Sequence, residues 1–226
     1  MLFNRNEVVF GRTIEKPSQD DIKNTMGLWN ASVEDAIKFG GDVTRAAIQA
    51  MNLRGDYKHI VVDVKTHMLM PNMIPAIPGW HTDGVPRGAD LNPASKGDPN
   101  IYAQETMRSP RYHLLVTGGN CPTRFIRDRD IEIGIENGHN PKLYSDISAY
   151  VKLREGRGWF DTYDAPDSQV VEWDWWELHT AQRARGHGWR YLIRVTETDH
   201  IAPQTDLRQV LRTQQQVYMP TEVFGW

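Results

Sequence analysis

Cysteine is nearly absent from this sequence. Cys121 is the single cysteine among 226 residues, so no disulfide can form within the chain and a disulfide-stapled scaffold is excluded. Long apolar runs are also missing, because no stretch approaches the roughly 20 residues that a membrane-spanning helix needs. Residues 1–10 contain no apolar signal-peptide core. We therefore expect a cytoplasmic protein, in a reducing compartment and without a membrane partner.

An excess of charge of either sign is missing as well. Lysine and arginine number 26 against 29 aspartate and glutamate, which gives a formal net charge of −3. Because phosphate contacts dominate the affinity of proteins for duplex nucleic acid, this balance argues against such a partner. The hydrophobic fraction of 39%, with eight tryptophans and eight tyrosines, is sufficient for one core. We predict a single domain over residues 1–226, and nothing in the composition specifies an oligomeric state.

Helix start signals occupy the N-terminal part, residues 1–56. Ser18 precedes two acids, and Ser32 precedes a short segment that stops at Gly40. Serine at an N-cap with acids in the first turn is typical of helix starts. Asp42 is the expected N-cap of residues 43–53, where alanine and methionine recur at helical spacing. We therefore predict that this part is helical.

From residue 57 onward, the spacing of apolar residues is that of strands and no longer that of helices. Helices followed by many strands, without regular β–α alternation, favour a mainly β fold over a doubly wound sheet. We predict a double-stranded β-helix, or jelly roll, over residues 57–226, with the N-terminal helices packed outside. A helix is expected at 142–154, and residues 84–110 form a long polar loop that is a candidate lid. Strands are predicted from β-branched or alternating segments at 59–64, 112–117, 131–135, 170–178, 189–196 and 210–219.

One short segment, Gly79-Trp80-His81-Thr82-Asp83, carries two side chains of the metal-ligand type. Alternate residues of a strand point to one face, so His81 and Asp83 project together. His179, at the end of the predicted strand 170–178, is the candidate third ligand. Two imidazoles and one carboxylate occupy one face of an octahedral ion and leave three positions open for a cosubstrate and an oxidant. Taken alone the triplet is a weak signal, because His-x-Asp arises by chance and His81 could equally be a hydrogen-bonded or solvent-facing histidine.

A second segment, residues 178–195, strengthens the metal interpretation. His179 closes one strand, a polar connector follows, and the next strand places Arg190, Leu192 and Arg194 on one face. An arginine on an inward strand face is costly unless it meets an anion. Because a guanidinium suits a bidentate grip on a carboxylate, we expect Arg190 to face a bound anion.

Together the two segments resemble the Fe(II)/2-oxoglutarate-dependent oxygenases. That family has His-x-Asp/Glu, a long interval, a distal histidine and then an arginine on the following strand. Trp80-His81 and Asp83 are similar to the Trp-His-x-Asp form of phytanoyl-CoA hydroxylase-type members. The spacing of eleven residues from His179 to Arg190 is similar to that of taurine dioxygenase-type members. The resemblance covers about residues 60–196 and implies a jelly-roll core.

The resemblance implies a role for each matching residue. His81, Asp83 and His179 would hold Fe(II) and form the catalytic centre, and Arg190 would bind the far carboxylate of 2-oxoglutarate. Thr123 follows a Gly-Gly-Asn turn that resembles a Gly-Gly-Asp-Thr segment, although two residues are inserted here, and it is a second candidate 2-oxoglutarate contact.

Two further residues are candidate substrate contacts. Arg194 lies four residues after Arg190, the position at which taurine dioxygenase-type members contact the substrate, and Trp80 adjoins the first ligand. Trp173 and Trp175 share the strand parity of His179, so they could line the site, although core packing is the commoner role of such residues.

The expected activity is therefore that of a 2-oxoglutarate-dependent dioxygenase. With Fe(II) and O₂ it would hydroxylate a small or polar substrate and release succinate and CO₂. Two alternatives remain open from the sequence. A cupin-like barrel would bind a metal without 2-oxoglutarate, and a non-catalytic jelly-roll module would bind a ligand with the triad incidental.

Overall fold

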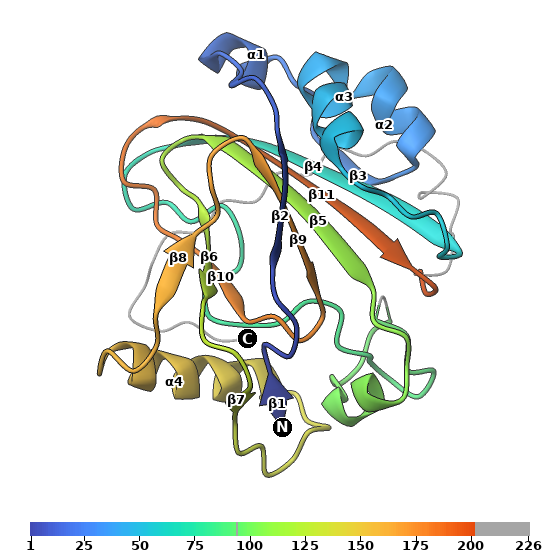
Figure 1. The fold of residues 1–226 in the computed structure, drawn as a ribbon, viewed down its shortest axis with the longest axis vertical. Helices are drawn as coiled ribbons and strands as arrows, with labels where there is room; N and C mark the ends of the chain where they lie inside the picture. The colour runs from blue at the N-terminus through green and yellow to red at the C-terminus, as the bar shows by residue number, and fades with distance from the viewer. Residues whose placement is uncertain (94, 202–226) are drawn as a thin grey trace.

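The protein is mainly β, as the sequence predicts. The computed structural model describes residues 1–93 and 95–201, so the predicted strand 210–219 lies outside the described residues. The strands form a six-stranded sheet, a three-stranded sheet and a two-stranded pair, with helices packed around them (Figure 1). Neighbouring strands are antiparallel, and the sheets formed by the described residues do not close into a barrel.

The six-stranded sheet is the centre of the molecule. β4 and β11 are each 11 residues long, and they pair in continuous register from His59 opposite Thr198 to Leu69 opposite Gly188. This register fixes which side chains of the two strands lie together on each face of the sheet. The strand order is β2 (Val9–Thr13), β9 (Gln169–Asp174), β5 (Arg111–Gly118), β11 (Gly188–Thr198), β4 (His59–Leu69) and β3 (Leu28–Ala31).

A smaller three-stranded sheet lies beside one face of the large sheet. Its order is β10 (His179–Ala181), β6 (Thr123–Ile126) and β8 (Thr162–Asp164). The helix α4 (Leu143–Glu155) closes the end of the space between the two sheets (Figure 1). A short pair, β1 (Leu2–Phe3) with β7 (Ile131–Glu132), lies next to this helix.

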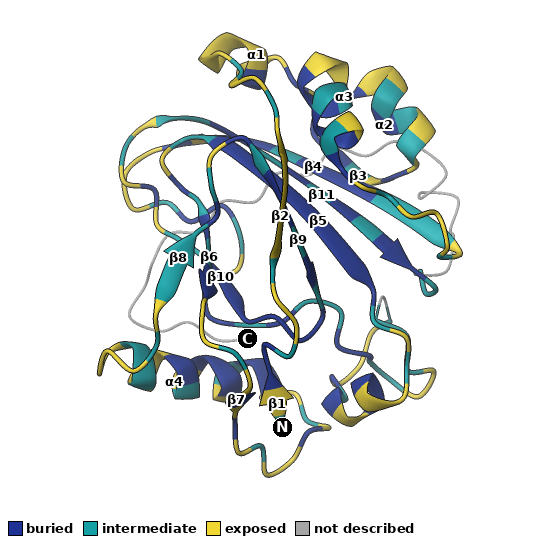
Figure 2. Ribbon diagram, in the orientation of Figure 1, coloured by how far each residue is buried: buried dark blue, intermediate teal, exposed yellow. Residues whose placement is uncertain are grey.

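Buried apolar residues form two layers, one on each face of the six-stranded sheet. Figure 2 shows that much of this sheet is buried. β5 contributes to both, because alternate residues point to opposite faces: Leu114 packs inward and Leu115 outward. The inner layer includes Phe125 of β6 and Ile147 of α4, whereas the outer layer includes Ile48 of α3. Each fully buried side chain of this size contributes about 1.5–3 kcal/mol relative to an exposed one.

Three helices cover the outer face: α1 (Gln19–Lys23), α2 (Val33–Phe39) and α3 (Gly41–Ala50). The predicted N-caps Ser18 and Ser32 are confirmed, whereas the predicted N-cap Asp42 is wrong, because Gly40 occupies that position of α3. The Ser18 hydroxyl accepts from the Asp21 amide at 3.1 Å, and the Asp21 carboxylate accepts from the Ser18 amide at 3.0 Å. This reciprocal pair is a capping box, and Ser32 caps α2 in the same way without the return bond. α3 begins one residue before Asp42, with Gly40 as its N-cap.

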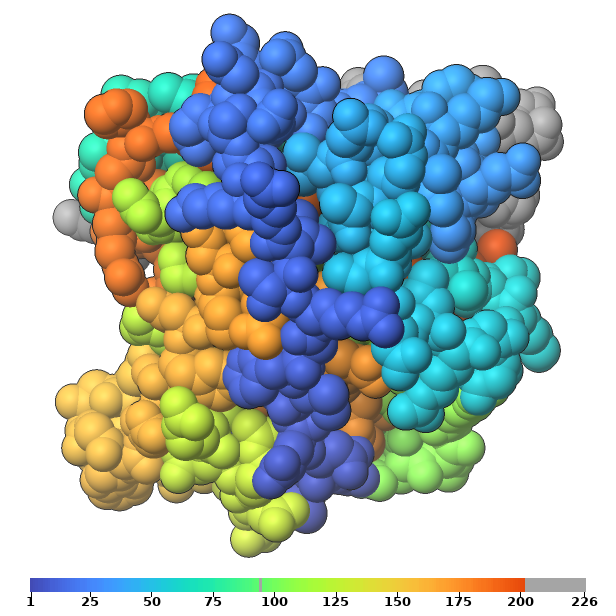
Figure 3. Space-filling view, turned by 45° about the horizontal axis from the view of Figure 1, so that its top comes forward, coloured from blue at the N-terminus to red at the C-terminus, as the bar shows by residue number. Residues whose placement is uncertain are grey.

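The N-terminal part is not purely helical, which corrects the prediction for residues 1–56. β1, β2 and β3 all lie within it, and β2 pairs with β9 while β3 pairs with β4. In the space-filling view the N-terminal segment crosses the molecule as a dark-blue band beside the orange residues of β9 (Figure 3). All five residues of β2 are exposed, so this edge strand carries no apolar alternation that the sequence could reveal.

The predicted strand 170–178 is divided into two elements. β9 ends at Asp174, whose side chain accepts from the Trp176 amide at 2.8 Å and so stabilises a turn. The chain then crosses to the small sheet, where β10 begins at His179. His179 therefore lies on a different sheet from the strand that precedes it. The predicted strand 131–135 is likewise shorter, because pairing stops at Glu132.

None of the helices within residues 1–93 and 95–201 combines the length and apolarity required to cross a membrane.

Candidate metal centre and adjoining cavity

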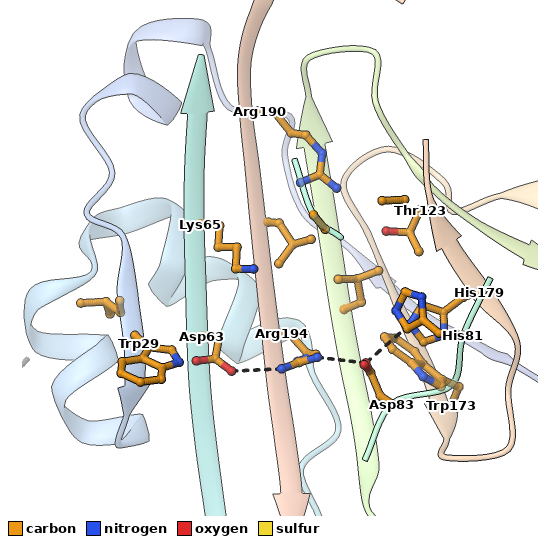
Figure 4. A pocket seen from close by; sticks show the side chains of 15 residues that line it. Trp29, Asp63, Lys65, His81, Asp83, Thr123, Trp173, His179, Arg190 and Arg194 are labelled. Carbon is orange, nitrogen blue, oxygen red and sulfur yellow. Dashed lines mark hydrogen bonds and ion pairs between the residues drawn. The ribbon is translucent and has the colours of Figure 1, made fainter. Parts of the chain in front are cut away.

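The three predicted metal ligands meet at the edge of the small sheet. His81 and His179 form an isolated antiparallel bridge, in which each backbone amide donates to the carbonyl of the other residue at 3.0 Å. Asp83 follows His81 by two residues and turns to the same side (Figure 4). One nitrogen of each imidazole and one oxygen of Asp83 lie within 4.8 Å of one another. Backbone pairing thus brings together residues almost a hundred positions apart.

Both imidazole rings are oriented by hydrogen bonds to the backbone. Nδ1 of His81 lies 2.8 Å from the Gly79 carbonyl, and Nδ1 of His179 lies 3.1 Å from the Glu177 carbonyl. A carbonyl only accepts, so Nδ1 donates in each ring and Nε2 is the nitrogen left for a metal. Nε2 of His179 lies 3.5 Å from Oδ2 of Asp83, which is within twice a metal–ligand bond of about 2.1 Å. Ligating histidines are typically held in this way by their second nitrogen.

The protonation states at neutral pH suit a divalent metal. Burial, together with the neighbouring His179 ring, lowers the pKa of His81 to about 4, so this ring is neutral. Burial acts to raise the pKa of the Asp83 carboxyl, but the Arg194 guanidinium and the His179 ring outweigh it and hold that pKa well below its usual range. The site therefore offers a neutral imidazole and an ionised carboxylate, the forms that bind metals.

Arg194 is engaged by two carboxylates. It donates to Oδ2 of Asp83 at 2.9 Å and to Oδ2 of Asp63 at 3.3 Å (Figure 4). The register of β11 against β4 sets Asp63 directly opposite Arg194. The backbone amide of Asn30 occupies the other Asp63 oxygen at 3.0 Å. The predicted substrate contact Arg194 thus reaches the site, but in this structure it positions the ligand Asp83.

A cavity of about 360 Å³ adjoins the three ligands. It lies between the inner face of the large sheet and the small sheet, and Figure 4 shows the labelled side chains converging on it. Polar and aromatic groups form most of its wall, and five aliphatic residues complete it. The lining residues are Leu28, Trp29, Asp63, Lys65, Ala76, His81, Asp83, Leu114, Thr123, Trp173, His179, Ala181, Arg190, Leu192 and Arg194.

Arg190 lies in this cavity as a buried cation without an acidic partner. Its side chain is 2% exposed, and its Nε–H donates to the Cys121 carbonyl at 2.6 Å. Its terminal nitrogens form no ion pair with any residue of 1–93 or 95–201. Burial lowers the pKa of Arg190, because no anion offsets the loss of water. Arg190 therefore borders the cavity, and the bound anion that the sequence analysis expects it to face stays a prediction.

Gly119 explains how the turn after β5 approaches Arg190 so closely. Its φ is +68°, and a Cβ there would lie 2.6 Å from the Cβ of Arg190. Such a contact is too short for any larger residue, and the positive φ favours glycine independently. The turn that the sequence shows at residues 118–120 therefore leaves the Arg190 side chain room to enter the cavity.

Thr123 and Trp173 occupy the wall between Arg190 and the metal ligands. Thr123 begins β6 opposite Ala181, and Figure 4 shows its side chain directed into the cavity. The Trp173 ring lies edge-on to His179 with centroids 5.4 Å apart, and its buried Nε1–H has no hydrogen-bond acceptor among the described residues. Trp175, the other tryptophan of the same parity, lies in the core and does not line the cavity.

Trp80 is the one predicted site residue that the structure places elsewhere. Its side chain is 2% exposed and packs in the core against α4. Its indole N–H donates to Glu155 of that helix at 2.9 Å, and its backbone amide donates to the Ser148 hydroxyl at 3.1 Å. Because Trp80 and His81 are adjacent on an extended segment, they point in opposite directions. Trp80 therefore does not line the cavity beside the triad, and it links the His81 segment to α4, so a substrate contact by Trp80 stays a prediction.

Sequence reasoning missed three polar or aromatic residues of the cavity wall: Trp29, Asp63 and Lys65. Asp63 and Lys65 alternate on β4 within a β-branched run, and two charged residues on one face of such a strand were the available signal. Trp29 lies on β3, which is four residues long and irregularly paired, so no periodicity indicates it.

The predicted lid, residues 84–110, contains a 3₁₀ helix at Ile101–Glu105 and borders a second cavity of about 260 Å³. This second cavity adjoins the first, since Asp63, Asp83 and Arg194 line both. A lid function stays a prediction.

Comparisons with protein-family models, with curated proteins and with solved structures give no significant match. The function is therefore argued from the site.

Proposed function

We propose that this protein is an Fe(II)- and 2-oxoglutarate-dependent oxygenase. The observation that carries the proposal is the meeting, in one cavity, of a two-histidine, one-carboxylate set with a buried arginine that has no acidic partner in the described chain. A metal ion would explain the first group and a carboxylate anion the second. A cupin-like metal barrel that binds no 2-oxoglutarate would not explain why the Arg190 guanidinium is buried in the cavity.

The strand order supports a jelly-roll core. Eight segments can be counted along the chain: β4, the His81 segment, β5, β6, β8, β9, β10 and β11. The pairs formed are first with eighth, second with seventh, third with sixth and fourth with fifth. Such nested pairs are those of a long antiparallel ribbon folded over on itself into two sheets, as in a jelly roll.

The residues present fit both groups. Nε2 of His81, Nε2 of His179 and a carboxylate oxygen of Asp83 would hold the iron, whose open positions suit a chelating cosubstrate. When bound, iron and 2-oxoglutarate supply the oxidising power from O₂, with succinate and CO₂ as products. The protein itself contributes binding, orientation and exclusion of water.

Each cavity residue has a definite task in this proposal. Arg190 would bind the far carboxylate of 2-oxoglutarate, and Thr123 would donate a hydrogen bond to the same ligand. Trp173 keeps water from the histidine face of the cavity. Arg194 holds one oxygen of Asp83 and so directs the carboxylate toward the two imidazoles.

Anaerobic titration provides the test. Fe(II) and 2-oxoglutarate, added together to the protein without O₂, should give the weak visible charge-transfer band of the chelate. His81→Ala should abolish the band, whereas His187→Ala, at an exposed position in the β10–β11 connector, should leave it unchanged. If the unaltered protein binds Fe(II) but gives no band that depends on 2-oxoglutarate, the oxygenase proposal fails and a simple metal-binding role replaces it. If the band appears, succinate release measured against a panel of metabolites would identify the substrate.

A further inference from the structure

Besides Arg190 and Arg194, the cavity contains a third cation, Lys65, which has no role in the metal and 2-oxoglutarate sites proposed above. It lies on β4 opposite Leu192, and it borders the cavity with the arginines of β11. Its ammonium forms no hydrogen bond or ion pair within the part of the chain that the structure describes. Burial lowers the pKa of Lys65, and Arg194 and Arg190 lower it further, although Asp63 and Asp83 oppose part of this effect. A bound anion would offset the remaining cost.

The carboxylates near Lys65 already accept hydrogen bonds from other groups. Asp63 accepts from Arg194 and from the Asn30 amide, and Asp83 accepts from Arg194. Three cations and two carboxylates line the cavity, so one positive charge is left over. A divalent metal adds two positive charges and 2-oxoglutarate removes two. The fully loaded cavity therefore still has one uncompensated positive charge.

The position of Lys65 separates it from the 2-oxoglutarate path. Figure 4 shows the metal ligands on the small-sheet side of the cavity, Arg190 at one end, and Lys65 on the opposite β4 side. A ligand that runs from the metal to Arg190 follows the small-sheet wall past Thr123. The β4 side, where Leu28 and Trp29 complete the wall beside Lys65, remains open to a second ligand.

We propose that Lys65 binds the anionic group of the primary substrate, which is an organic acid with a carboxylate or phosphate group. The apolar part of this acid lies against Leu28 and Trp29. The three candidate metal ligands line the same cavity, so the bound acid would share the space that the metal site borders. This inference rests on the proposed function for the reaction, but the anion site can be tested separately.

The test compares acids with their neutral counterparts. The probes are phenylacetate against phenylacetamide, hexanoate against hexanamide, and phenyl phosphate against phenol. Calorimetry would use protein loaded with Zn(II) and 2-oxoglutarate, which cannot turn over, and also metal-free protein. At least one acid should bind about 10- to 100-fold more tightly than its neutral counterpart, as expected for one charge-assisted contact in a partly dry site.

Three variants make the test specific. Lys65→Met should abolish the preference for the acid, and Lys65→Arg should retain most of it. Arg190→Met should keep the preference in metal-free protein while losing 2-oxoglutarate. A midpoint of thermal unfolding close to that of the unaltered protein would show that Lys65→Met is folded, whether or not 2-oxoglutarate binds.

The outcomes separate the two ideas. If no acid is preferred in the unaltered protein, or if the preference survives in Lys65→Met, the inference about Lys65 is wrong. If the preference depends on Lys65 but the unaltered protein gives no 2-oxoglutarate band, the anion site stands and the oxygenase proposal fails.

Discussion

Replacement of Arg190 by methionine is expected to weaken 2-oxoglutarate binding strongly. The guanidinium is 2% exposed, so solvent screens it little, and its terminal nitrogens have no acidic partner in residues 1–93 and 95–201. A bidentate carboxylate contact contains two charge-assisted hydrogen bonds, and truncating one partner of such a buried pair costs about 2–5 kcal/mol. The dissociation constant of 2-oxoglutarate should therefore rise by about 30-fold to several thousand-fold.

The ligand-free protein should respond differently to the same change. The depressed pKa of Arg190 reflects the cost of burying its charge, and methionine removes that cost while filling a similar volume. Against this gain stands the lost hydrogen bond to the Cys121 carbonyl, worth about 1.5–3 kcal/mol. Because the two effects oppose each other, we expect the melting temperature of the free protein to change by less than about 5 °C.

Two measurements decide the case: anaerobic titration of the Fe(II) protein with 2-oxoglutarate, and thermal unfolding of the metal-free protein. Arg124→Met is the matched control, because Arg124 pairs with Asp164 at 2.8 Å and does not line the cavity. It should change the dissociation constant by less than about twofold. Binding by Arg190→Met within about threefold of the unaltered protein would refute the assignment of Arg190.

Three further predictions concern the surroundings of the site. The pKa of His81 is about 4 in the folded protein, and that of an unfolded histidine is about 6.5. The free energy of unfolding of the metal-free protein should therefore fall by about 3 kcal/mol as the pH falls from 6.5 to 4. Urea unfolding of His81→Gln should lack this pH-dependent contribution. Trp80→Phe should cost about 1–3 kcal/mol in urea unfolding through its lost buried hydrogen bond, yet leave the 2-oxoglutarate dissociation constant unchanged; a large rise would restore Trp80 to the site. Gly119→Ala should weaken 2-oxoglutarate binding, because the new Cβ displaces Arg190. The control is Gly158→Ala, at a position with a similar φ and open space around a Cβ, and it should cost only about 1 kcal/mol of stability. Equal 2-oxoglutarate affinities of the two variants would contradict the packing argument.

Local signals in the sequence predicted the local structure well. Ser18 and Ser32 mark helix starts because an N-cap acts within three residues, and the long strands β4, β5 and β11 have apolar character along much of their length. The short strands β2, β3, β6 and β8 were not predicted, because they are edge strands or only three to five residues long. Pairing with a partner strand, rather than their own composition, makes them strands.

The candidate site likewise combines features that local sequence predicts with features that depend on strand pairing. The sequence by itself determined the donor types and their local geometry: the alternation of a strand places His81 and Asp83 on one side and sends Trp80 to the other. It also indicated that Arg190 would face inward, since the face of a strand follows from parity.

Only the tertiary structure decided what meets across strands. The bridge that joins His81 to His179, the register that sets Asp63 opposite Arg194, and the presence of Lys65 in the same cavity depend on which strands pair and in what register. A single sequence contains no direct record of register, because one residue of slip exchanges the two faces of a strand without changing its composition. Burial of the whole core selects the register, and so the identity of the ligands is local while their convergence is not.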